Sequence, residues 1–341
     1  MIITKTPFRM SFFGGGTDMP AFFNEHGGAV ISTTFDKYCY VNVRHMPPFH
    51  PYISELVYNR FERVNNIEDI EHPLIRECMR LHDIHEIRLT YEGDLPARTG
   101  LGTSSTFAVG MLNAFCALKG RRISYRQLAQ EAIHVERDVL QEHGGWQDQV
   151  AAAYGGLNRI DFKDGDFTVR PIVISPERKY ELDENLLLFY TGIQRLSSEI
   201  QADTFAKPID KTQQLLDMLQ LVDEAEKILC DENTSLSEFG KLLDTTWKLK
   251  RGTGAKVSNG NIDELYDIAI KAGALGGKLL GAGGGGFFLF YCEKEKHSAL
   301  VNAMNKLMIV PFKFETGGAQ VLYYAPQVYS PRKDASLRDS I

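Results

Sequence analysis

A loop rich in glycine and hydroxyl residues joins a strand-like segment to a helix-like one in the first half of the chain. Residues 94–110 read DLPARTGLGTSSTFAVG, after an alternating segment at 86–96 and before apolar residues at helical spacing up to Leu118. The start of a helix leaves backbone N–H groups unpaired and carries a partial positive charge, so such a loop can cradle an anion such as phosphate. Ordinary capping of the helix by Thr103 or Ser104 explains the same residues. The pattern predicts strand, loop and helix, and leaves the role of the loop open.

Two common phosphate-binding motifs do not match this loop. A P-loop requires Gly-Lys followed by Ser or Thr, whereas Gly102 is followed by Thr103 and Ser104. The dinucleotide fingerprint requires a third glycine where Ser105 stands. A phosphate site at this position must therefore belong to another class.

The composition is typical of a globular protein with two domains. At 341 residues the chain exceeds what one hydrophobic core usually covers, and its formal net charge is −6. Because no basic stripe is present, we expect no nucleic-acid partner and a local site for any anion. Five dispersed cysteines indicate a reducing compartment, and neither a signal peptide nor an apolar run of ~20 residues is found. We expect a cytoplasmic protein that does not bind membranes, and the sequence leaves a homodimer open.

Two carboxylates stand where they could serve chemistry. Residues 124–145 read as a helix with a capping box, and Glu136 falls on its apolar face. A carboxylate there is either a paired core residue or a ligand of Mg2+, which prefers oxygen donors. Asp148, within GGWQDQVAAAYGG, stands at the start of a short helix. It either caps this helix or serves as a catalytic base.

The remaining sequence predicts an α+β frame around these residues. Residues 2–13 and 27–44 read as strands on either side of the turn GGGTD. The second half contains helices at 211–230, 235–251 and 261–275, a glycine-dense turn and strand at 276–291, and closing strands at 311–315 and 320–325. We expect an N-terminal domain at 1–185, a C-terminal domain at 186–330 and a tail at 331–341.

Three glycine-rich segments resemble, in kind and in order, the three signature motifs of the GHMP kinases, a superfamily that includes galactokinase, homoserine kinase and mevalonate kinase. They read PFRMSFFGGGTD, PARTGLGTSS and KLLGAGGGG and span residues 7–286. The resemblance implies an N-terminal domain like domain 2 of ribosomal protein S5 and a ferredoxin-like C-terminal domain. It also implies an ATP-dependent kinase that binds ATP and Mg2+ in the cleft between the domains.

The resemblance also assigns roles to individual positions. Asp148 takes the place of the catalytic aspartate, and Arg9 falls where related sugar kinases carry a basic residue near the transferred group. Lys5 is an alternative partner of the aspartate, but Arg9 fits better. Ser104 or Ser105, with Glu136, would hold Mg2+. The residues that would contact ATP are Pro96, Gly100, Leu101, Gly102, Thr103, Ser104, Ser105 and Gly283.

The acceptor is inferred from the same resemblance. The combination of FRMSFFGGGTD, GWQDQVAAAYGG and KLLGAGGGGFFLF most resembles the sequences of kinases that act on D-glycero-D-manno-heptose 7-phosphate. This resemblance implies transfer to the anomeric C1 hydroxyl and a 1,7-bisphosphate product. Arg195, Lys250 and Arg251 would bind the phosphate that the acceptor already carries, although a solvated helix end also explains the last two. The residues that would contact the sugar are Gly14, Gly15, Gly16, Thr17 and Asp18.

Two other interpretations remain open at this point. An unphosphorylated sugar such as fucose would make Lys250 and Arg251 dispensable, while galactose is disfavoured because the Gly-Glu-His of galactokinases is absent from the first segment. A non-catalytic sugar sensor on the same fold is disfavoured because Glu136 and Asp148 are both present. We expect the irregular stretch 45–70 to help form the adenine pocket.

Overall fold

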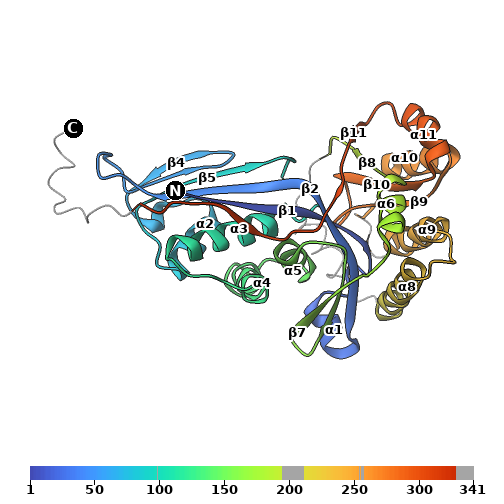
Figure 1. Cartoon of the computed structure of the whole chain (residues 1–341), viewed down its shortest axis with the longest axis horizontal. Coiled ribbons are helices and arrows are strands. Elements are labelled where there is room, and N and C mark those ends of the chain that lie inside the picture. Colours follow the sequence, from blue (N-terminus) through green and yellow to red (C-terminus); the bar gives the residue numbers. More distant parts are fainter. Residues whose placement is uncertain (98, 194–210, 253, 255–256, 328–341) are drawn as a thin grey trace.

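The computed structural model consists of a large sheet with its helices and a smaller sheet with its own helices (Figure 1). The structure describes residues 1–97, 99–193, 211–252, 254 and 257–327. The predicted α+β class is confirmed, because helices and largely antiparallel strands alternate irregularly along the chain. One hydrophobic cluster runs from the large sheet into α8, α9 and β10 of the smaller half, and a second cluster lies within the smaller half.

Two long antiparallel strands, β1 (Ile2–Phe13) and β2 (Gly28–His45), form the centre of the large sheet. The strand order is β13-β1-β2-β5-β3-β4, with β6, β7 and β12 attached to β2 or to each other. The pairing of β1 with β2 shifts its register between Pro7 and Arg9, an irregularity of a kind that often lies beside active sites. The other strands of this sheet are β3 (Ser54–Val57), β4 (Phe61–Val64), β5 (Ile87–Gly93), β6 (Asn158–Lys163), β7 (Asp166–Pro171), β12 (Phe314–Glu315) and β13 (Gln320–Tyr324).

The predicted helix after the glycine-rich loop is the central helix of the larger half. This helix, α3 (Thr103–Leu118), packs on β1 and β2, and every residue from Ser105 to Leu118 is buried. Because it is apolar around most of its circumference, it can be stable only when it is covered on all sides. Its burial fixes the loop at its N-terminus in space. The other helices of this half are α1 (Pro20–His26), α2 (Pro73–Leu81), α4 (Tyr125–Ile133) and α5 (Gln147–Tyr154).

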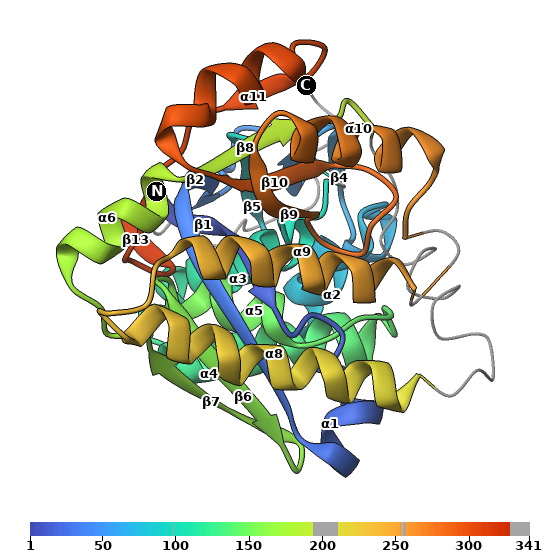
Figure 2. The same cartoon turned by 90° about the vertical axis from the view of Figure 1, so that its right-hand side faces the viewer.

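The smaller half is built on an antiparallel sheet of order β11-β8-β10-β9. Trp247, Tyr266 and Phe288 pack ring against ring in its core. Its strands are β8 (Leu186–Tyr190), β9 (Ala274–Leu279), β10 (Phe287–Cys292) and β11 (Met308–Val310). Its helices are α6 (Pro176–Glu184), α8 (Thr212–Cys230), α9 (Ser237–Arg251), α10 (Gly260–Lys271) and α11 (His297–Ala303), and Figure 2 shows α8 and α9 side by side.

The end of the chain returns to the large sheet, whereas the sequence predicts its strands in the second layer. β12 pairs with β2, and β13 pairs with β1 at the edge of the sheet. In Figure 1 this dark red segment runs back along the larger half. Strand pairing depends on which sheet edge is open in the folded molecule, and the local sequence does not predict this edge. The last part of the predicted C-terminal domain therefore completes the first sheet.

The helix predicted over 124–145 is shorter and changes type. Its capping box between Ser124 and Gln127 is present, but α4 ends at Ile133 and His134–Val139 continue as a π-helix. Single π-turns inside helices are frequent at functional sites, and this one carries Glu136. α1, β6 and α6 add to the predicted elements.

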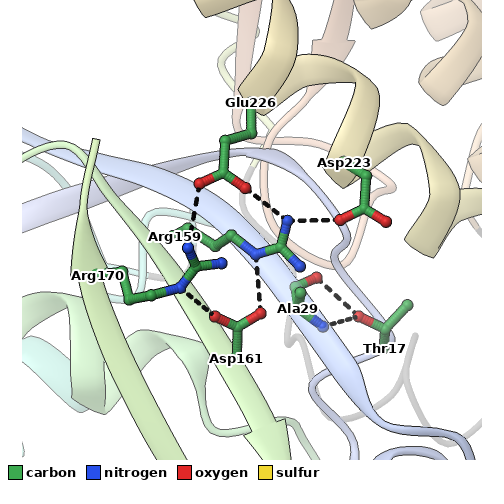
Figure 3. Close-up of polar contacts among 7 residues, drawn as sticks. All are labelled: Thr17, Ala29, Arg159, Asp161, Arg170, Asp223 and Glu226. Atoms are coloured by element: carbon green, nitrogen blue, oxygen red, sulfur yellow. Dashed lines mark hydrogen bonds and ion pairs between the residues drawn. The ribbon is translucent and has the colours of Figure 1, made fainter. Parts of the chain in front are cut away.

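Ion pairs fix α8 to the hairpin of β6 and β7 (Figure 3). Arg159 on β6 pairs with Asp161 at 2.8 Å and with Glu226 of α8 at 2.7 Å. Asp223 of α8 is a further partner of Arg159, and Arg170 on β7 pairs with Asp161 at 3.0 Å. Because the Arg159 guanidinium on β6 bonds two carboxylates of α8, the two halves are held in register at this point.

The longest helix described is α8, with 19 residues. In the part of the chain that the structure describes, neither α8 nor any other helix combines the length and the apolar character that crossing a bilayer demands.

Candidate active site

A cavity of about 490 Å³ lies between the two halves of the molecule. The larger half contributes residues of β1, the turn before α1, the start of α3, the π-helix and the start of α5, and the smaller half contributes residues of α8, α9 and β9. Cavities of several hundred cubic ångströms are typical of small-molecule sites. All three glycine-rich segments reach this cavity, since Gly16, Gly100 and Gly281 line it.

The hydroxyl-rich loop brings a helix N-terminus without a side-chain cap to the cavity. Gly102 is the N-cap of α3, with a left-handed φ of +71°, and no side chain of the described residues caps the helix. Helix geometry leaves the first backbone N–H groups without intrahelical partners, so Ser104 and Ser105 can offer theirs to a ligand. Thr103, Ser104 and Ser105 all line the cavity. This geometry favours an anion site over the alternative of a self-capped helix.

The third glycine-rich segment packs directly against this loop. A Cβ on Gly281 would lie 2.3 Å from the Cα of Gly100, and a Cβ on Gly286 would lie 2.1 Å from the carbonyl oxygen of Thr99. Both glycines have a positive φ, of +74° and +101°. Only glycine allows two backbones to approach so closely, so the third segment supports the loop from behind.

Three of the predicted ATP-contacting residues do not line the cavity. The carbonyl of Pro96 accepts a hydrogen bond of 2.8 Å from the hydroxyl of Thr99, and Leu101 is buried in the core. A Cβ on Gly283 would meet the carbonyl oxygen of Val257 at 2.6 Å. These residues shape the loop from outside the cavity.

Arg9 and Asp148 form an ion pair at the wall of the cavity, in which two Arg9 nitrogens contact one carboxylate oxygen. Arg9 Nε and Nη2 lie 2.8 and 2.7 Å from Asp148 Oδ1, and Arg9 Nη1 donates to the carbonyl of Gly100 at 2.9 Å. Asp148 lies in the first turn of α5, and a Cβ on Gly102 would be 3.2 Å from its Oδ2. The carboxylate therefore adjoins the N-terminus of α3. Lys5 instead lies 3.6 Å from Glu315, so Arg9 is the basic partner of Asp148.

Glu136 projects from the π-helix into the same cavity and is 1% exposed. Its Oε2 accepts hydrogen bonds from Ser105 Oγ at 2.7 Å and Gln149 Nε2 at 2.5 Å. Its other oxygen, Oε1, is buried and has no hydrogen-bond partner among the described residues. A buried carboxylate oxygen without a partner is costly, and a divalent cation would satisfy it. The donor set of one carboxylate and nearby hydroxyls fits Mg2+.

Asp18 closes the cavity on the side of the first glycine-rich segment. Its carboxylate accepts hydrogen bonds from the backbone N–H groups of Gly16 at 2.9 Å and Gln147 at 3.2 Å. Burial raises the pKa of Asp18, and the nearby Asp148 carboxylate raises it further, while the backbone donors oppose the shift. A Cβ on Gly145 would lie 1.8 Å from Asp18 Oδ2, so glycine is required there for Asp18 to reach this position.

The predicted sugar-contacting residues separate into two groups. Gly15, Gly16 and Asp18 line the cavity, whereas Gly14 and Thr17 do not. The hydroxyl of Thr17 donates to the carbonyls of Gly14 at 2.8 Å and Ala29 at 2.9 Å, and accepts from the N–H of Ala29 (Figure 3). Thr17 thus holds the turn against β2 and presents no group to the cavity.

The predicted cations for the acceptor phosphate also separate. Lys250 lines the cavity and donates to the carbonyls of Leu279, at 3.3 Å, and Gly281. Burial, and to a lesser extent the charge of Arg9, lowers the pKa of Lys250 to about 8. Arg251 pairs with Asp263 at 3.0 Å and does not line the cavity. The prediction for Arg195 lies outside the described residues.

Lys278 on β9 is a cavity residue that the sequence-based assignment of site residues missed. Its ammonium donates to the carbonyl of Phe12 at 2.8 Å, and the residue is buried. Burial, followed by the charges of Lys250 and Arg9, lowers the pKa of Lys278 well below its usual value. Its position inside the third motif was the only signal available. Arg9, Lys250 and Lys278 therefore surround the two carboxylates Asp18 and Asp148.

Aromatic side chains line another part of the cavity. Tyr91 and His72 contact Phe107 edge to face, with ring centroids 4.8 and 5.8 Å away, and Tyr58 packs on His72 at 4.9 Å. Burial lowers the pKa of His72, which favours the neutral imidazole. Flat apolar surfaces of this kind suit a planar heterocyclic ring. Tyr58 comes from the stretch 45–70, whereas His72, Tyr91 and Phe107 lie beyond it.

The cavity thus combines an aromatic surface, an uncapped helix N-terminus, a carboxylate suited to a divalent cation, and a carboxylate paired with arginine. Such a set can hold a nucleoside polyphosphate and bring a hydroxyl group to Asp148. Phosphoryl transfer requires little more than this positioning and charge compensation.

Comparison with known proteins agrees with this geometry. The model of the GHMP kinase N-terminal domain matches residues 70–156, and that of the GHMP kinase C-terminal domain matches residues 221–310. The first match contains the hydroxyl-rich loop, Glu136 and Asp148, and the second contains Lys250, Lys278 and the third glycine-rich segment.

Individual relatives span most of the chain. The D-glycero-alpha-D-manno-heptose 7-phosphate kinase of Campylobacter jejuni is 28% identical over 321 residues, which cover 89% of this chain and 93% of that protein. The L-fucokinase/L-fucose-1-P guanylyltransferase of Bacteroides fragilis is 26% identical over 340 residues, which cover 87% of this chain but 35% of that protein. The crystal structure of a D-glycero-D-manno-heptose 1-phosphate kinase from Bacteroides thetaiotaomicron superposes with a TM-score of 0.77 at 24% identity, covering 97% of this chain and all of the other, and shows the same fold.

Proposed function

The chain belongs to the GHMP kinases, and we propose that this ATP-dependent sugar kinase transfers a phosphoryl group to the C1 hydroxyl of D-glycero-D-manno-heptose 7-phosphate. The product would be the 1,7-bisphosphate. The observation that carries the proposal is the Arg9–Asp148 pair beside the uncapped N-terminus of α3. In this proposal, Asp148 is the proton acceptor and Arg9 is a fixed cation next to a polyphosphate cradle.

In the proposed reaction, Asp148 orients the acceptor hydroxyl and accepts its proton. The hydroxyl oxygen forms a bond to the γ-phosphorus while the bond between that phosphorus and the bridging oxygen breaks, and ADP leaves. Arg9 stabilises charge on the transferring group, and it is already positioned because its Nη1 bonds the carbonyl of Gly100 in the loop. Because both groups are fixed before the substrates bind, little reorganisation is needed in the transition state.

Glu136 and Ser105 are the residues that would hold Mg2+, with Ser104 close by on the same turn. When bound, the ion would offset the negative charge of the β- and γ-phosphates. The chain's own contribution is to keep the carboxylate in place through Ser105 and Gln149.

The acceptor end of the cavity favours a substrate that carries its own negative charge. Lys250 and Lys278 supply two buried amino groups close to Asp18. Burying a cation is unfavourable unless an anion compensates for it, and burial lowers the pKa of both lysines. A phosphate on the acceptor would favour their charged forms, while Asp18 and the backbone of Gly15 and Gly16 would contact sugar hydroxyls.

A screen of ADP release tests the acceptor. The panel holds D-glycero-D-manno-heptose 7-phosphate, the free heptose, mannose 6-phosphate, L-fucose and galactose, each at a series of concentrations with saturating ATP and Mg2+. We expect kcat/KM to be highest for the heptose 7-phosphate by at least about a hundredfold over the free heptose, because the free sugar lacks the charged group that the buried amino groups would contact. Phosphorus NMR of the product then shows whether the new phosphate is on C1.

Fucose is the second candidate, favoured by the relative from Bacteroides fragilis and by the position of Arg251 outside the cavity. A higher kcat/KM for L-fucose than for any sugar phosphate would replace the heptose phosphate as acceptor. Tight ATP binding without turnover of any sugar would indicate a sensor instead of a kinase.

A further inference from the structure

A second cluster of metal-binding side chains lies away from the cavity, on the helices of the larger half. His82 follows the last residue of α2, Cys116 lies on α3 and Glu131 lies on α4. One donor atom of each residue lies within 4.8 Å of the other two. The His82 Nε2 and Glu131 Oε2 atoms are 3.3 Å apart. Side chains of this kind from three separate helical segments meet at one point.

Two of the three side chains are largely covered, whereas that of Glu131 is 41% exposed. Cys116 is 3% exposed, and the side chain of His82 is 10% exposed. Glu131 Oε2 is covered and accepts no hydrogen bond within the described residues, although His82 Nε2 is close to it. A covered carboxylate oxygen with nothing donating to it needs a positive partner, and a bound cation supplies one.

We propose that His82, Cys116 and Glu131 bind one Zn2+ ion. Imidazole nitrogen, thiolate sulfur and carboxylate oxygen are all zinc ligands, and the thiolate disfavours Mg2+ and Ca2+. In tetrahedral coordination, bonds of 2.0–2.3 Å place donor atoms roughly 3.5 Å apart, so small side-chain rotations would close the present cluster around the ion. Water would complete the fourth position, because the carboxylate lies at the protein surface.

Several charged groups surround this cluster. Burial raises the pKa of the Cys116 thiol to about 11, Glu131 raises it further, and Arg121 and Lys119 lower it. Burial raises the pKa of the Cys78 thiol, and the charges of Glu136 and Glu131 raise it further. The cluster is joined to the π-helix through α4, which carries Glu131 and ends where the π-helix begins.

The ion would join the helices that position the catalytic groups. α3 begins at the phosphate loop and passes Cys116 near its other end, and α4 runs from Glu131 directly into the π-helix. Zinc would therefore brace α2, α3 and α4 against one another, at a distance from the reacting groups. This role is independent of which sugar is the acceptor.

The experiment titrates the full-length protein, freed of metal by a chelator, with Co2+ and then displaces the Co2+ with Zn2+. Wild type should show the near-ultraviolet charge-transfer band of a thiolate–cobalt bond, with an amplitude that corresponds to one thiolate-bound ion per chain. A Mg2+ site made of oxygen donors cannot give this band. Cys116→Ser should abolish the band, and His82→Gln and Glu131→Gln should each weaken Zn2+ binding by at least about tenfold, since even the loss of an outer-shell partner costs that much. Zn2+ should raise the melting temperature of wild type and of Cys230→Ser, which removes an exposed thiol elsewhere.

Absence of the band in wild type, or equal Zn2+ affinity in wild type and all three variants, would overturn the proposal. If Cys116→Ser fails to fold, as judged by circular dichroism, the two partly exposed ligands decide the question. A lower melting temperature for His82→Gln without any metal binding by wild type would show an ion pair only.

Discussion

Replacing Asp148 by asparagine separates the two parts that its carboxylate plays. In the wild type, Oδ1 receives two contacts from Arg9, at 2.8 and 2.7 Å, and the carboxylate adjoins the N-terminus of α3. Asparagine has nearly the same shape and keeps one oxygen acceptor for Arg9, but it cannot accept a proton from the acceptor hydroxyl. A positioned acid or base contributes about 10²- to 10⁴-fold to rate. We therefore expect kcat to fall by about that factor while the KM for ATP changes less than about threefold.

The same substitution has a cost in stability that must be separated from the loss of rate. Arg9 is almost fully buried, and a hydrogen bond to a charged group contributes about 1.5–3 kcal/mol. Because the asparagine oxygen retains part of that bond, we expect the free energy of unfolding to fall by about 1–2 kcal/mol, a loss that leaves a folded enzyme to assay.

Asp161→Asn is the matched control, because Asp161 is also held by arginines but lies outside the cavity. Arg159 and Arg170 donate to its two oxygens at 2.8 and 3.0 Å. This variant should lose about 1 kcal/mol or less and keep kcat within twofold. Steady-state ADP release and denaturant unfolding of both variants provide the comparison. A kcat for Asp148→Asn within tenfold of wild type, or an equal loss of kcat in both variants, would refute the assignment of Asp148 as the base.

Three further predictions concern the metal, the acceptor and the loop. Glu136→Gln should raise the Mg2+ concentration needed for half-maximal rate by about tenfold or more, because it removes the negative charge of the carboxylate whose Oε1 has no hydrogen-bond partner among the described residues. An unchanged Mg2+ requirement would contradict this prediction. Because the pKa of Lys250 is lowered to about 8, its charge is present below that pH and lost above it. The KM of the wild type for a phosphorylated acceptor should therefore rise as the pH increases through about 8. The pH profile of this KM should be flatter for Lys250→Gln in the same range. Gly281→Ala should weaken ATP binding and lower the free energy of unfolding by about 1–3 kcal/mol, because its Cβ would lie 2.3 Å from Gly100 Cα. Gly165 is the control, because it has a similar φ of +72° and a Cβ there would meet no atom within 4 Å. In a denaturant titration, Gly165→Ala should lower the free energy of unfolding only by the cost of the positive φ, and it should leave the KM for ATP unchanged.

The sequence predicts the parts of the site in which local chemistry and local structure coincide. A helix that is apolar all round and preceded by glycine and hydroxyl residues can only be a buried helix with an exposed polar start, and α3 has this form. Asp148 is similarly marked by its place in the first turn of a short helix bounded by glycines. In these cases the neighbours along the chain define the environment.

Proximity along the chain is a poor guide to shared function where the side chains of two adjacent residues point in different directions. Lys250 and Arg251 read as one basic cluster, yet Lys250 reaches the cavity and Arg251 pairs with Asp263. Consecutive residues on an α-helix point about 100° apart, so a helix end cannot present both side chains to one ligand. Helical geometry alone therefore argues against such a pair.

Other features depend on contacts between distant segments, which sequence does not report. Lys278 sits in a glycine-rich strand where a lysine would ordinarily face solvent, and it is buried because the carbonyl of Phe12, 266 positions earlier, comes within hydrogen-bonding distance of it. The return of β13 to β1 likewise depends on an edge that only the assembled sheet creates.

Because the net charge of the chain is −6, the cavity must supply the positive charge that attracts phosphate groups. A protein with an overall negative field repels ATP at long range, so attraction must come from charges close to the bound phosphates. Arg9, Lys250 and Lys278 provide these charges inside the cavity, where water and salt screen them less than on the surface. Before a substrate binds, the carboxylates of Asp18 and Asp148 reduce the electrostatic repulsion among these three basic groups. Each of these cations also bonds a backbone carbonyl, of Gly100, Gly281 or Phe12, so their geometry is fixed before any substrate arrives.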